Sequence, residues 1–281
     1  MPELPEVETI ARGLDKRVTG DVIESVWIGS KPEPLKSSAR AIAAMLEGAS
    51  IERVHRAGKH IVIDLSKGRK RATSTDLAGH WIVHLGMTGR LLVAGPQMEV
   101  AKHTHLIAKL ASGRELRFVD PRRFGRLSVV KLAGKDQNGN VFTGTEPLEI
   151  EFQAFAALFR KRDTPMKSAL LNQKLLRGVG NIYADESLFR AKVRPRRRAG
   201  KLTQVELQRL HAAIQQVLRE AIAAGGSSVS DYVDASGDEG FFQLQHRVYG
   251  RAGEPCLVCK TPIKRIVIAG RSSHYCPKCQ K

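Results

Sequence analysis

Apolar side chains recur three or four residues apart over the first eighteen positions of the chain. Such spacing lets one stripe of a helix face a core, and it is formed by Val7, Ile10, Ala11, Leu14 and Val18. Pro5 suits the first turn of this helix, where Glu6 and Glu8 complement the positive end of the helix dipole. We therefore predict a helix that begins near Pro5.

The next hundred residues change to short β-rich segments, which are separated by glycine or by charged turns. Five of these segments predict strands: His60–Leu65, Trp81–His84, Arg90–Val93, Leu106–Leu110 and Leu127–Leu132. Their pattern predicts a β-sandwich. The stretch 134–144 is rich in Gly, Asn and Asp and sparse in apolar residues, so it is the best linker candidate and places a domain break near residue 140.

Helical periods return after this linker. Four segments predict helices: Phe152–Arg160, Lys167–Leu175, Asn181–Arg190 and Thr203–Ala224, the last stopped by Gly225 and Gly226. The glycine turn RGVGN at 177–181 precedes the third of these helices. Backbone N–H groups at such a start are well placed to hold a phosphate, although many helical corners use glycine for geometry alone.

All four cysteines fall in the last 26 residues, as the pairs Cys256/Cys259 and Cys276/Cys279. Two CxxC pairs at this spacing suit one tetrahedral zinc ion, with a β-hairpin between them. The alternatives are four unused thiols or two disulfides, which are rare in a cytoplasmic chain. Four protein ligands leave the metal no open position, so we expect a structural ion. The segment 251–281 carries seven basic residues and one acidic residue, and this indicates contact with nucleic acid.

The overall charge points to the same class of partner. The chain has 46 Lys and Arg against 28 Asp and Glu, a net charge of +18, which favours a polyanion over a small acidic substrate. Seven basic residues and no acid lie between Arg190 and Lys201. A basic soluble enzyme without such a partner is the alternative. With 42% hydrophobic residues, no long apolar run and no signal pattern, we expect a cytoplasmic protein without membrane contact.

The opening residues MPELPEVETI pose a separate question, because a helix start requires neither Pro2 nor Glu3. A residue as small as proline after the initiator Met normally leads to removal of that Met, which leaves Pro2 as a free secondary amine. A terminal amine has a pKa of about 8, so a usable fraction is unprotonated and nucleophilic at neutral pH. A plain helix start is the alternative interpretation.

Several motifs follow one another along the chain: PELPE at 2–6, Lys59 before a strand, HLGMTG at 84–89, DPRRFG at 120–125, GVGN at 178–181 and the four-Cys finger. Together they resemble the formamidopyrimidine-DNA glycosylase family of bacterial repair enzymes, from Pro2 to Lys281. The resemblance implies an α+β fold: an N-terminal β-sandwich with flanking helices over 1–140, a helix–two-turns–helix domain over 141–245 and a β-hairpin zinc finger over 246–281. It also implies that DNA binds across the cleft between these parts.

The same resemblance implies a bifunctional enzyme that removes oxidised purines, such as 8-oxoguanine and formamidopyrimidines, and then cleaves the abasic site by β,δ-elimination. The mature Pro2 would attack the sugar C1′ and form a cationic iminium, while Glu3 helps to open the sugar ring. Glu6 would support this site from one turn further along the helix. Lys59 would serve β-elimination and contact a phosphate, and Arg271 would serve δ-elimination. One structural Zn²⁺ is implied as the cofactor.

A base inside a duplex cannot be reached, so the damaged nucleotide must be extruded and the gap must be filled. By resemblance, Met87 and Phe124 wedge apolar surface into the stack, and Arg122 offers donors to the estranged cytosine. Backbone contacts are implied for five further residues: His84, His103, Arg162, Lys167 and Asn181. The partner is double-stranded DNA that contains oxidised bases, and we expect a monomer near the bacterial nucleoid.

Two segments bear on how this chain differs from the family. The segment 68–80 looks longer and more polar than usual, and 227–242 aligns with a loop that covers the extruded base.

Two other functions compete with the main interpretation. One is an endonuclease VIII-like glycosylase for oxidised pyrimidines, against which Leu4 and the intact HLGMTG and DPRRFG motifs stand. The other is a non-catalytic zinc-finger protein that binds DNA, in which Pro2, Glu3 and Lys59 would be free to vary.

Overall fold

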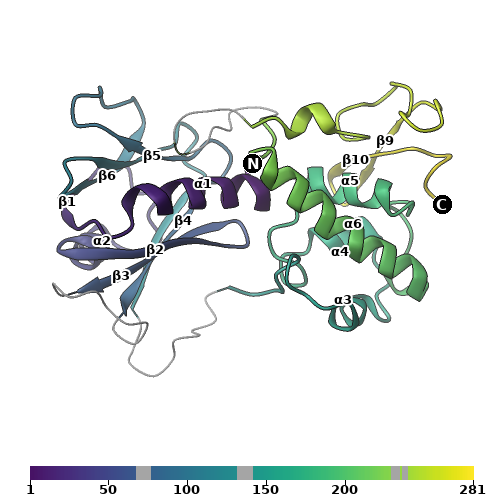
Figure 1. Cartoon of the computed structure of the whole chain (residues 1–281), viewed down its shortest axis with the longest axis horizontal. Helices are drawn as coiled ribbons and strands as arrows, with labels where there is room; N and C mark the ends of the chain where they lie inside the picture. Colours follow the sequence, from purple (N-terminus) through teal and green to yellow (C-terminus); the bar gives the residue numbers. More distant parts are fainter. Residues whose placement is uncertain (68–76, 132–141, 229–234, 236–239) are drawn as a thin grey trace. The chain divides into compact units, whose positions relative to one another are not determined.

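The computed structural model describes residues 1–67, 77–131, 142–228, 235 and 240–281. The chain forms two compact units (Figure 1), one made of 1–141 with 225–240 and the other of 142–224 with 241–281. The helix and strands that the sequence predicts before residue 140 belong to the first unit. The helices and the finger predicted after it belong to the second unit. The finer boundary at residue 245 stays a prediction.

Two four-stranded antiparallel sheets build the first unit, and the predicted β-sandwich is thus confirmed, although only five of its eight strands were predicted. One sheet has the order β1-β6-β7-β5 and the other β2-β3-β4-β8. Their strands are β1 (Ile23–Ile28), β2 (Ala49–Ala57), β3 (His60–Lys67), β4 (Leu77–His84), β5 (Arg90–Ala94), β6 (Thr104–Leu110), β7 (Glu115–Val119) and β8 (Arg126–Lys131). Apolar residues of both sheets, among them Ile63, Trp81, Leu106 and Phe118, join one buried core. Burying these large side chains is the main stabilising contribution to such a sandwich.

Two helices complete this core. Helix α1 (Leu4–Val18) buries the predicted stripe of Val7, Ile10, Leu14 and Val18, and α2 (Ala39–Leu46) adds Ile42 and Leu46. Glu3 is the N-cap of α1, and Pro5 lies in its first turn. The predicted start near Pro5 is thus confirmed, and the chain enters the helix along a path that two prolines restrict.

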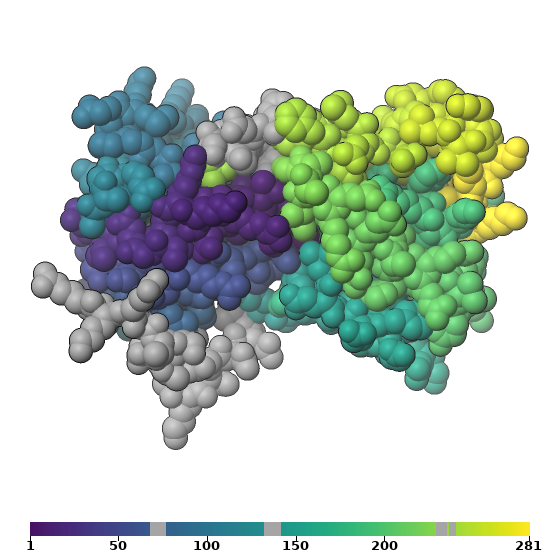
Figure 2. Space-filling model, in the orientation of Figure 1, coloured from purple at the N-terminus to yellow at the C-terminus, as the bar shows by residue number. Residues whose placement is uncertain are grey.

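The second unit is helical and ends in a hairpin. Its helices are α3 (Phe152–Phe159), α4 (Met166–Leu171), α5 (Asn181–Arg190) and α6 (Gln204–Ala223), and its hairpin consists of β9 (Lys264–Ile268) and β10 (Arg271–Tyr275). Thr203 and Glu206 form a reciprocal capping box at the start of α6. The amphipathic α6 keeps one face exposed on the surface of this unit (Figure 2), and it is followed by Gly225 and Gly226 at φ +74° and +86°.

The basic run from Arg190 to Lys201 differs from the expected cationic surface. Three of its arginines pair within the fold: Arg190 with Glu220 at 2.6 Å, Arg197 with Glu206 at 2.9 Å, and Arg198 with Asp163. The backbone of Arg194 also bonds to that of Lys281 at 3.0 Å. Acidic groups therefore lie against much of this run, and its clustering is weaker evidence for a nucleic-acid surface than its sequence suggests.

Three predicted features lie wholly or mostly outside the described residues. The structure does not describe 132–141, which covers most of the linker 134–144, or 68–76, which covers most of the longer segment 68–80. It also does not describe 229–234 and 236–239, which make up most of the loop 227–242. Within the part of the chain that the structure describes, no helix is long and apolar enough to cross a membrane.

Candidate active site and nucleic-acid interface

The N-terminal residues predicted to be catalytic lie at a buried helix start. Pro2 is buried, and Glu3 and Glu6 are 4% and 2% exposed, whereas the side chain of Met1 remains accessible. The N–H of Glu3 donates to Oε2 of Glu6 at 2.8 Å, which is half of the capping box of α1. The capping geometry therefore fixes the chain immediately after Pro2.

The second carboxylate oxygen of Glu6 holds a distant segment of the same unit. Its Oε1 accepts a hydrogen bond of 2.8 Å from the N–H of Ser227. Gly226 has φ +86°, and a Cβ at this position would lie 3.0 Å from Cγ of Glu6. Both the left-handed backbone and the close approach require glycine here. Glu6 thus joins the N-terminus to the residues at which the loop 227–242 begins.

Lys59 occupies the tight turn between β2 and β3. Ala57 and His60 are paired, so Gly58 and Lys59 form a two-residue loop. Gly58 has φ +60°, as the first central position of a type II′ turn requires. Lys59 is 9% exposed, so the turn holds a largely buried lysine rather than the solvated lysine that a strand start would usually have.

A partly buried ion pair connects this turn to α1. Nε of Arg56 lies 2.7 Å from Oε2 of Glu8, and Nη1 of Arg56 donates to the carbonyl oxygen of Gly58 at 3.2 Å. Burial raises the pKa of Glu8, but the hydrogen bonds and charges of Arg56 and Arg12 together outweigh it and lower this pKa overall. The helix that begins after Pro2 is therefore coupled through charged hydrogen bonds to the turn that carries Lys59.

His84 is held neutral beside Lys59. Burial is the main cause that lowers the pKa of His84 to about 4, and His60, Arg126 and Lys59 contribute in that order. Nδ1 of His84 faces the N–H of Gly86 at 3.1 Å and so accepts a hydrogen bond. The ring proton is consequently on Nε2, which is a suitable donor for a phosphate oxygen.

Two turns of the first unit are clamped together by one carboxylate. Asp120 is fully buried; its Oδ1 accepts from the hydroxyl of Thr88 at 2.6 Å, and its Oδ2 accepts from the N–H of Gly125 at 2.7 Å. A Cβ on Gly86 would lie 2.5 Å from the backbone of Phe124. The turns of the HLGMTG and DPRRFG motifs therefore touch backbone to backbone.

These turns expose apolar side chains. Met87 and Phe124 are 42% and 54% exposed, although large apolar residues are usually covered. The guanidinium carbon of Arg122 lies 4.9 Å from the centre of the Phe124 ring, a cation–π contact. His103, which is also exposed, stands in a neighbouring loop with φ +68°. The three predicted gap-filling residues thus occupy one surface built on the Thr88–Asp120 contact.

In the second unit, a glycine turn places Asn181 at the first position of α5. Gly178 has φ +95°, and Gln173 holds the turn by accepting from the N–H of Gly178 at 2.9 Å and donating to Val179 O at 2.8 Å. Nδ2 of Asn181 donates to Oγ of Ser272 at 3.3 Å, while its buried Oδ1 has no hydrogen-bond partner among the residues that the structure describes. A helix N-terminus with an amide side chain is chemically suited to a phosphate.

Lys167 differs from the expected surface cation. Its side chain is fully buried; Nζ lies 2.7 Å from Oδ1 of Asp185 and donates to Ser272 O at 2.5 Å. From this position the ammonium does not reach solvent, so its placement does not support the direct DNA contact that was predicted for Lys167. Asp185 also accepts from the N–H of His274 at 2.8 Å. The pair instead anchors β10 on the helices.

Arg271 and Arg162 are exposed at two turns of this unit. Ala269 and Gly270 have φ +47° and +75°, which gives a type I′ hairpin with Arg271 directly after it. Nε of Arg162 donates to the carbonyl oxygen of Leu158 at 2.5 Å, and the residue lines a pocket of about 460 Å³ that also contains Arg160 and Lys201. Both guanidinium groups are thus accessible for anion contacts.

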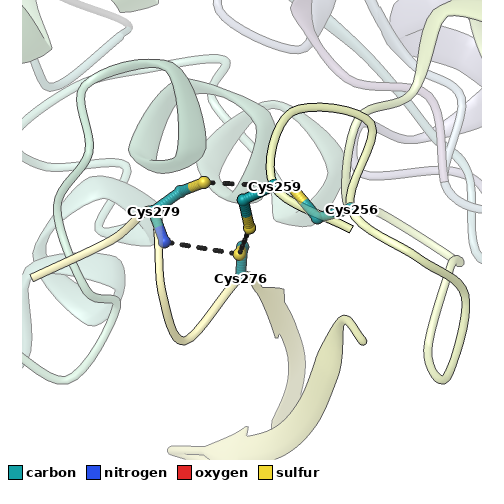
Figure 3. A group of neighbouring side chains, drawn as sticks. All are labelled: Cys256, Cys259, Cys276 and Cys279. Carbon is teal, nitrogen blue, oxygen red and sulfur yellow. Dashed lines mark hydrogen bonds between the residues drawn. The ribbon is translucent and has the colours of Figure 1, made fainter. Parts of the chain in front are cut away.

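The four cysteines converge as predicted (Figure 3). Their Sγ atoms all lie within 4.8 Å of one another, with 3.9 Å between Cys256 and Cys279 and 3.4 Å between Cys259 and Cys276. A tetrahedral zinc ion with Zn–S bonds of about 2.3 Å needs sulfur atoms about 3.8 Å apart. The donor set and its spacing therefore fit zinc.

The fold and the site define a DNA-repair architecture: a sandwich with a buried N-terminal acid pair, a helical unit with a phosphate-type turn, and a four-Cys finger. Family models match the chain as the N-terminal domain of formamidopyrimidine-DNA glycosylase over residues 1–127, its H2TH domain over 143–233 and the zinc finger found in FPG and IleRS over 253–281. The chain belongs to the formamidopyrimidine-DNA glycosylase family. It is a base-excision repair enzyme that combines DNA glycosylase and abasic-site lyase activities.

Individual relatives agree with this assignment. The formamidopyrimidine-DNA glycosylases of Solibacter usitatus and Desulfitobacterium hafniense are 46% and 43% identical to the chain, each over 100% of both sequences. The crystal structure of the Thermus thermophilus MutM (FPG) protein superposes with a TM-score of 0.84 at 41% identity, covering 99% of this chain and 98% of that one. A Lactococcus lactis Fpg in complex with DNA that contains N7-benzyl-Fapy-dG gives 0.88 at 33% identity, covering 100% of each.

Sequence reasoning missed the residues that support the site. These residues have no catalytic role that a sequence motif would indicate, and each contacts a partner that is distant in the sequence. They are Arg56, Thr88, Asp120 and Asp185. Thr88 and Asp120 do lie inside the HLGMTG and DPRRFG motifs, so their presence there was the one available signal.

Proposed function

We propose that the mature Pro2 is the nucleophile and that oxidised purines in double-stranded DNA, including formamidopyrimidines, are the substrates. In the full chain the Pro2 nitrogen is an amide of Met1 and has no nucleophilic lone pair. Removal of the accessible Met1 turns it into a secondary amine with a pKa of about 8, which is partly unprotonated at neutral pH. The observation that carries the proposal is that two buried acidic residues stand next to this amine. Glu3 follows it directly, and the N–H of Glu3 donates to the side chain of Glu6.

The reaction proceeds as a displacement followed by eliminations. The Pro2 nitrogen bonds to C1′ while the bond from C1′ to the base breaks, and the base leaves with a proton. Glu3 protonates the ring oxygen as the sugar opens, which leaves a cationic iminium on C1′. This iminium withdraws electrons and acidifies the C2′ proton, so the 3′ phosphate departs by β-elimination and the 5′ phosphate then departs by δ-elimination. Hydrolysis of the final iminium returns Pro2.

The surrounding residues divide the remaining work. We assign Lys59 to proton transfer in β-elimination and to a phosphate, and Arg271 to δ-elimination. Glu6 is occupied by two backbone N–H groups, so it positions the N-terminus and the start of the loop 227–242 rather than transferring a proton. Arg56 and Glu8 position the turn of Lys59 relative to α1.

DNA recognition uses the exposed turns of both units. Met87 and Phe124 fill the gap that the extruded nucleotide leaves, and Arg122 releases the Phe124 ring to donate to the estranged cytosine. His84, His103, Arg162 and Asn181 contact the DNA backbone. Lys167 supports this interface from inside, because it fixes Ser272, which is also the partner of Asn181. The protein acts as a cytoplasmic monomer.

One zinc ion holds the finger, and its role is structural, because four thiolates fill a tetrahedral shell. Metal binding contributes on the order of 10 kcal/mol to folding such a hairpin. Metal analysis should give one zinc per chain, and chelation should abolish DNA binding while the far-ultraviolet signal of the sandwich persists. A zinc-free protein that binds abasic-site DNA with unchanged affinity would contradict this role.

Borohydride trapping tests the nucleophile directly. Reduction of the iminium should join the enzyme irreversibly to an oligonucleotide duplex that holds 8-oxoguanine opposite cytosine, and Pro2→Gly should lose excision while it retains affinity for an abasic analogue. Arg12→Gln, an exposed change on the same helix, is the matched control and should trap like the parent protein. A Pro2→Gly protein that excises and traps at the parental rate would overturn the assignment. Thymine glycol in place of 8-oxoguanine separates an oxidised-pyrimidine enzyme from the one proposed.

A further inference from the structure

A pocket of about 400 Å³ in the first unit has no role in the account above. Trp27 of β1 forms one wall, and Lys31, His103, Pro121 and Arg123 also line it. Of these residues only His103 belongs to the predicted DNA contacts. The pocket therefore combines an aromatic ring with Lys31, Arg123 and two histidines, His103 and His105, and the described residues that line it include no Asp or Glu.

The Trp27 ring is presented rather than buried. Trp27 is 50% exposed, whereas the other tryptophan, Trp81, is fully buried in the core. A Cβ on Gly29 would lie 3.3 Å from Cη2 of Trp27, so the bare backbone at Gly29 leaves room for the indole along the strand. An exposed indole on an edge strand is unfavourable in water unless a partner covers it, and tryptophan is enriched at interfaces for this reason.

Two of these basic residues have a backbone conformation that is rare outside glycine. His103 and Arg123 take φ +68° and +58°. Left-handed backbone costs free energy for such residues and persists where the surrounding structure or a function requires it. Arg123 is further held by Glu33, whose carboxylate lies 2.6 Å from Nη1. The cationic rim of the pocket is thus a formed feature of the fold.

The pocket adjoins the gap-filling surface. Pro121 and Arg123, which line the pocket, alternate along one turn with Arg122 and Phe124, which fill the gap. The N–H of Asp120 also donates to the carbonyl oxygen of His103 at 3.0 Å, which fixes this turn against the rim. Because Arg123 directly follows Arg122, a DNA strand that presents its estranged base to Arg122 would lie close to this pocket.

We propose that this pocket binds a deoxyribose phosphate of the undamaged strand, next to the estranged base. The indole of Trp27 covers the apolar face of the sugar, and Lys31, His103 and Arg123 surround the phosphate. This inference rests on the proposed function, because Arg122 defines which strand passes the pocket. Trp27 is then a residue that anchors the opposite strand while the damaged nucleotide is extruded.

Intrinsic fluorescence tests the proposal, because the chain has only two tryptophans. Acrylamide should quench the free protein mainly through Trp27, and Trp27→Phe, which keeps only the buried Trp81, should show little quenching. Saturation with a duplex that holds a tetrahydrofuran abasic analogue opposite cytosine should protect Trp27. Removing undamaged-strand nucleotides on one side of that cytosine should restore quenching, and matched truncations of the damaged strand should not.

Affinity measurements complete the test. Trp27→Ala should weaken binding to the same duplex about tenfold with an unchanged salt dependence, whereas Lys31→Ala should reduce the slope of log K against log salt by about one. Val205→Ala, at a similarly exposed apolar position, is the control and should bind like the parent. Trp27 that stays fully quenchable in a saturated complex, or protection that is lost only when the damaged strand is shortened, would overturn the inference. Borohydride trapping on the same preparation separates this failure from a failure of the proposed function.

Discussion

The hydroxyl of Thr88 donates a 2.6 Å hydrogen bond to the fully buried carboxylate of Asp120, and this contact joins the two turns that expose Met87, Arg122 and Phe124. The gap-filling role that we propose for these residues requires a surface that keeps its shape while it displaces a stacked base. The Asp120–Thr88 contact would supply that rigidity from inside the fold, because both residues are buried.

Replacing Asp120 by Asn should uncouple the turns. The amide can accept from Thr88 or from the N–H of Gly125 but not from both, so one buried donor loses its partner, at a cost of about 1–3 kcal/mol in unfolding free energy. Excision of 8-oxoguanine should slow more than cleavage of a preformed abasic site, because only the former requires extrusion of a base. Urea unfolding and single-turnover assays measure the two effects. Thr88→Ser keeps the hydroxyl and should behave like the parent; equal slowing of both reactions would argue against a role in extrusion.

Removing the cation of the buried pair in the second unit should be severe. Lys167→Met leaves Asp185 without its ammonium partner in full burial, and such a loss costs about 3–5 kcal/mol. Denaturant unfolding of the zinc-loaded protein gives this value, and Arg271→Ala, at an exposed position, should stay within about 0.5 kcal/mol of the parent. A Lys167→Met protein of unchanged stability with greatly weakened DNA binding would show that Lys167 contacts DNA directly after all.

Arg56 offers a test of how Lys59 is positioned. Arg56→Gln removes the ion pair with Glu8 and weakens support of the Gly58 carbonyl, so β-elimination on abasic DNA should fall by about tenfold or more in kcat with little change in KM. Arg12→Gln removes the other arginine that bonds Glu8 and serves as the matched control, since its side chain is 63% exposed and holds no turn. Equal effects of the two variants would mean that Arg56 acts only through the charge of Glu8.

Stability should fall on acidification between pH 6.5 and 4. Burial is the main cause that lowers the pKa values of His84 and His246 to about 4, so over this window the unfolded chain binds more protons than the folded one. The unfolding free energy therefore rises with pH there, by up to about 1.4 kcal/mol per pH unit for each group, and the full contribution is present above pH 6.5. Unfolding in excess zinc at pH 7 and pH 5 measures it. His84→Gln should flatten this dependence, and an unchanged slope would contradict the neutral state of His84.

The local patterns predicted much of the fold. The stripe of α1 was visible because one face of this helix packs in the core, and the strands around Ile63 and Trp81 were visible as short β-rich runs. The strand β7 was missed because Arg117 and Glu115 look like solvent-facing residues, whereas they pair at 2.8 Å inside the fold. The helix α4 ends at Leu171 rather than at the predicted Leu175. β1 was missed because three of its six residues are exposed and its sequence IESVWI has no regular alternation of apolar and polar residues.

Some residues of the site could likewise be predicted from the sequence, and others could not. The cysteines and the N-terminal motif carry their chemistry in their own spacing, so they could be found in sequence. The position of Lys167 could not, because its charge is cancelled by Asp185 and its other partner, Ser272, lies 105 residues away. Three arginines of the run 190–201 likewise meet acids that only the folded chain brings to them.

The central claim is that the mature N-terminal nitrogen bonds covalently to deoxyribose. The most direct measurement is mass spectrometry of the borohydride-trapped complex after digestion of both protein and DNA. The account predicts that the N-terminal peptide begins at Pro2 and carries the mass of the reduced sugar fragment on that residue. A trapped sugar on Lys59 or another lysine, or an active enzyme whose N-terminal peptide still begins with Met1, would contradict it.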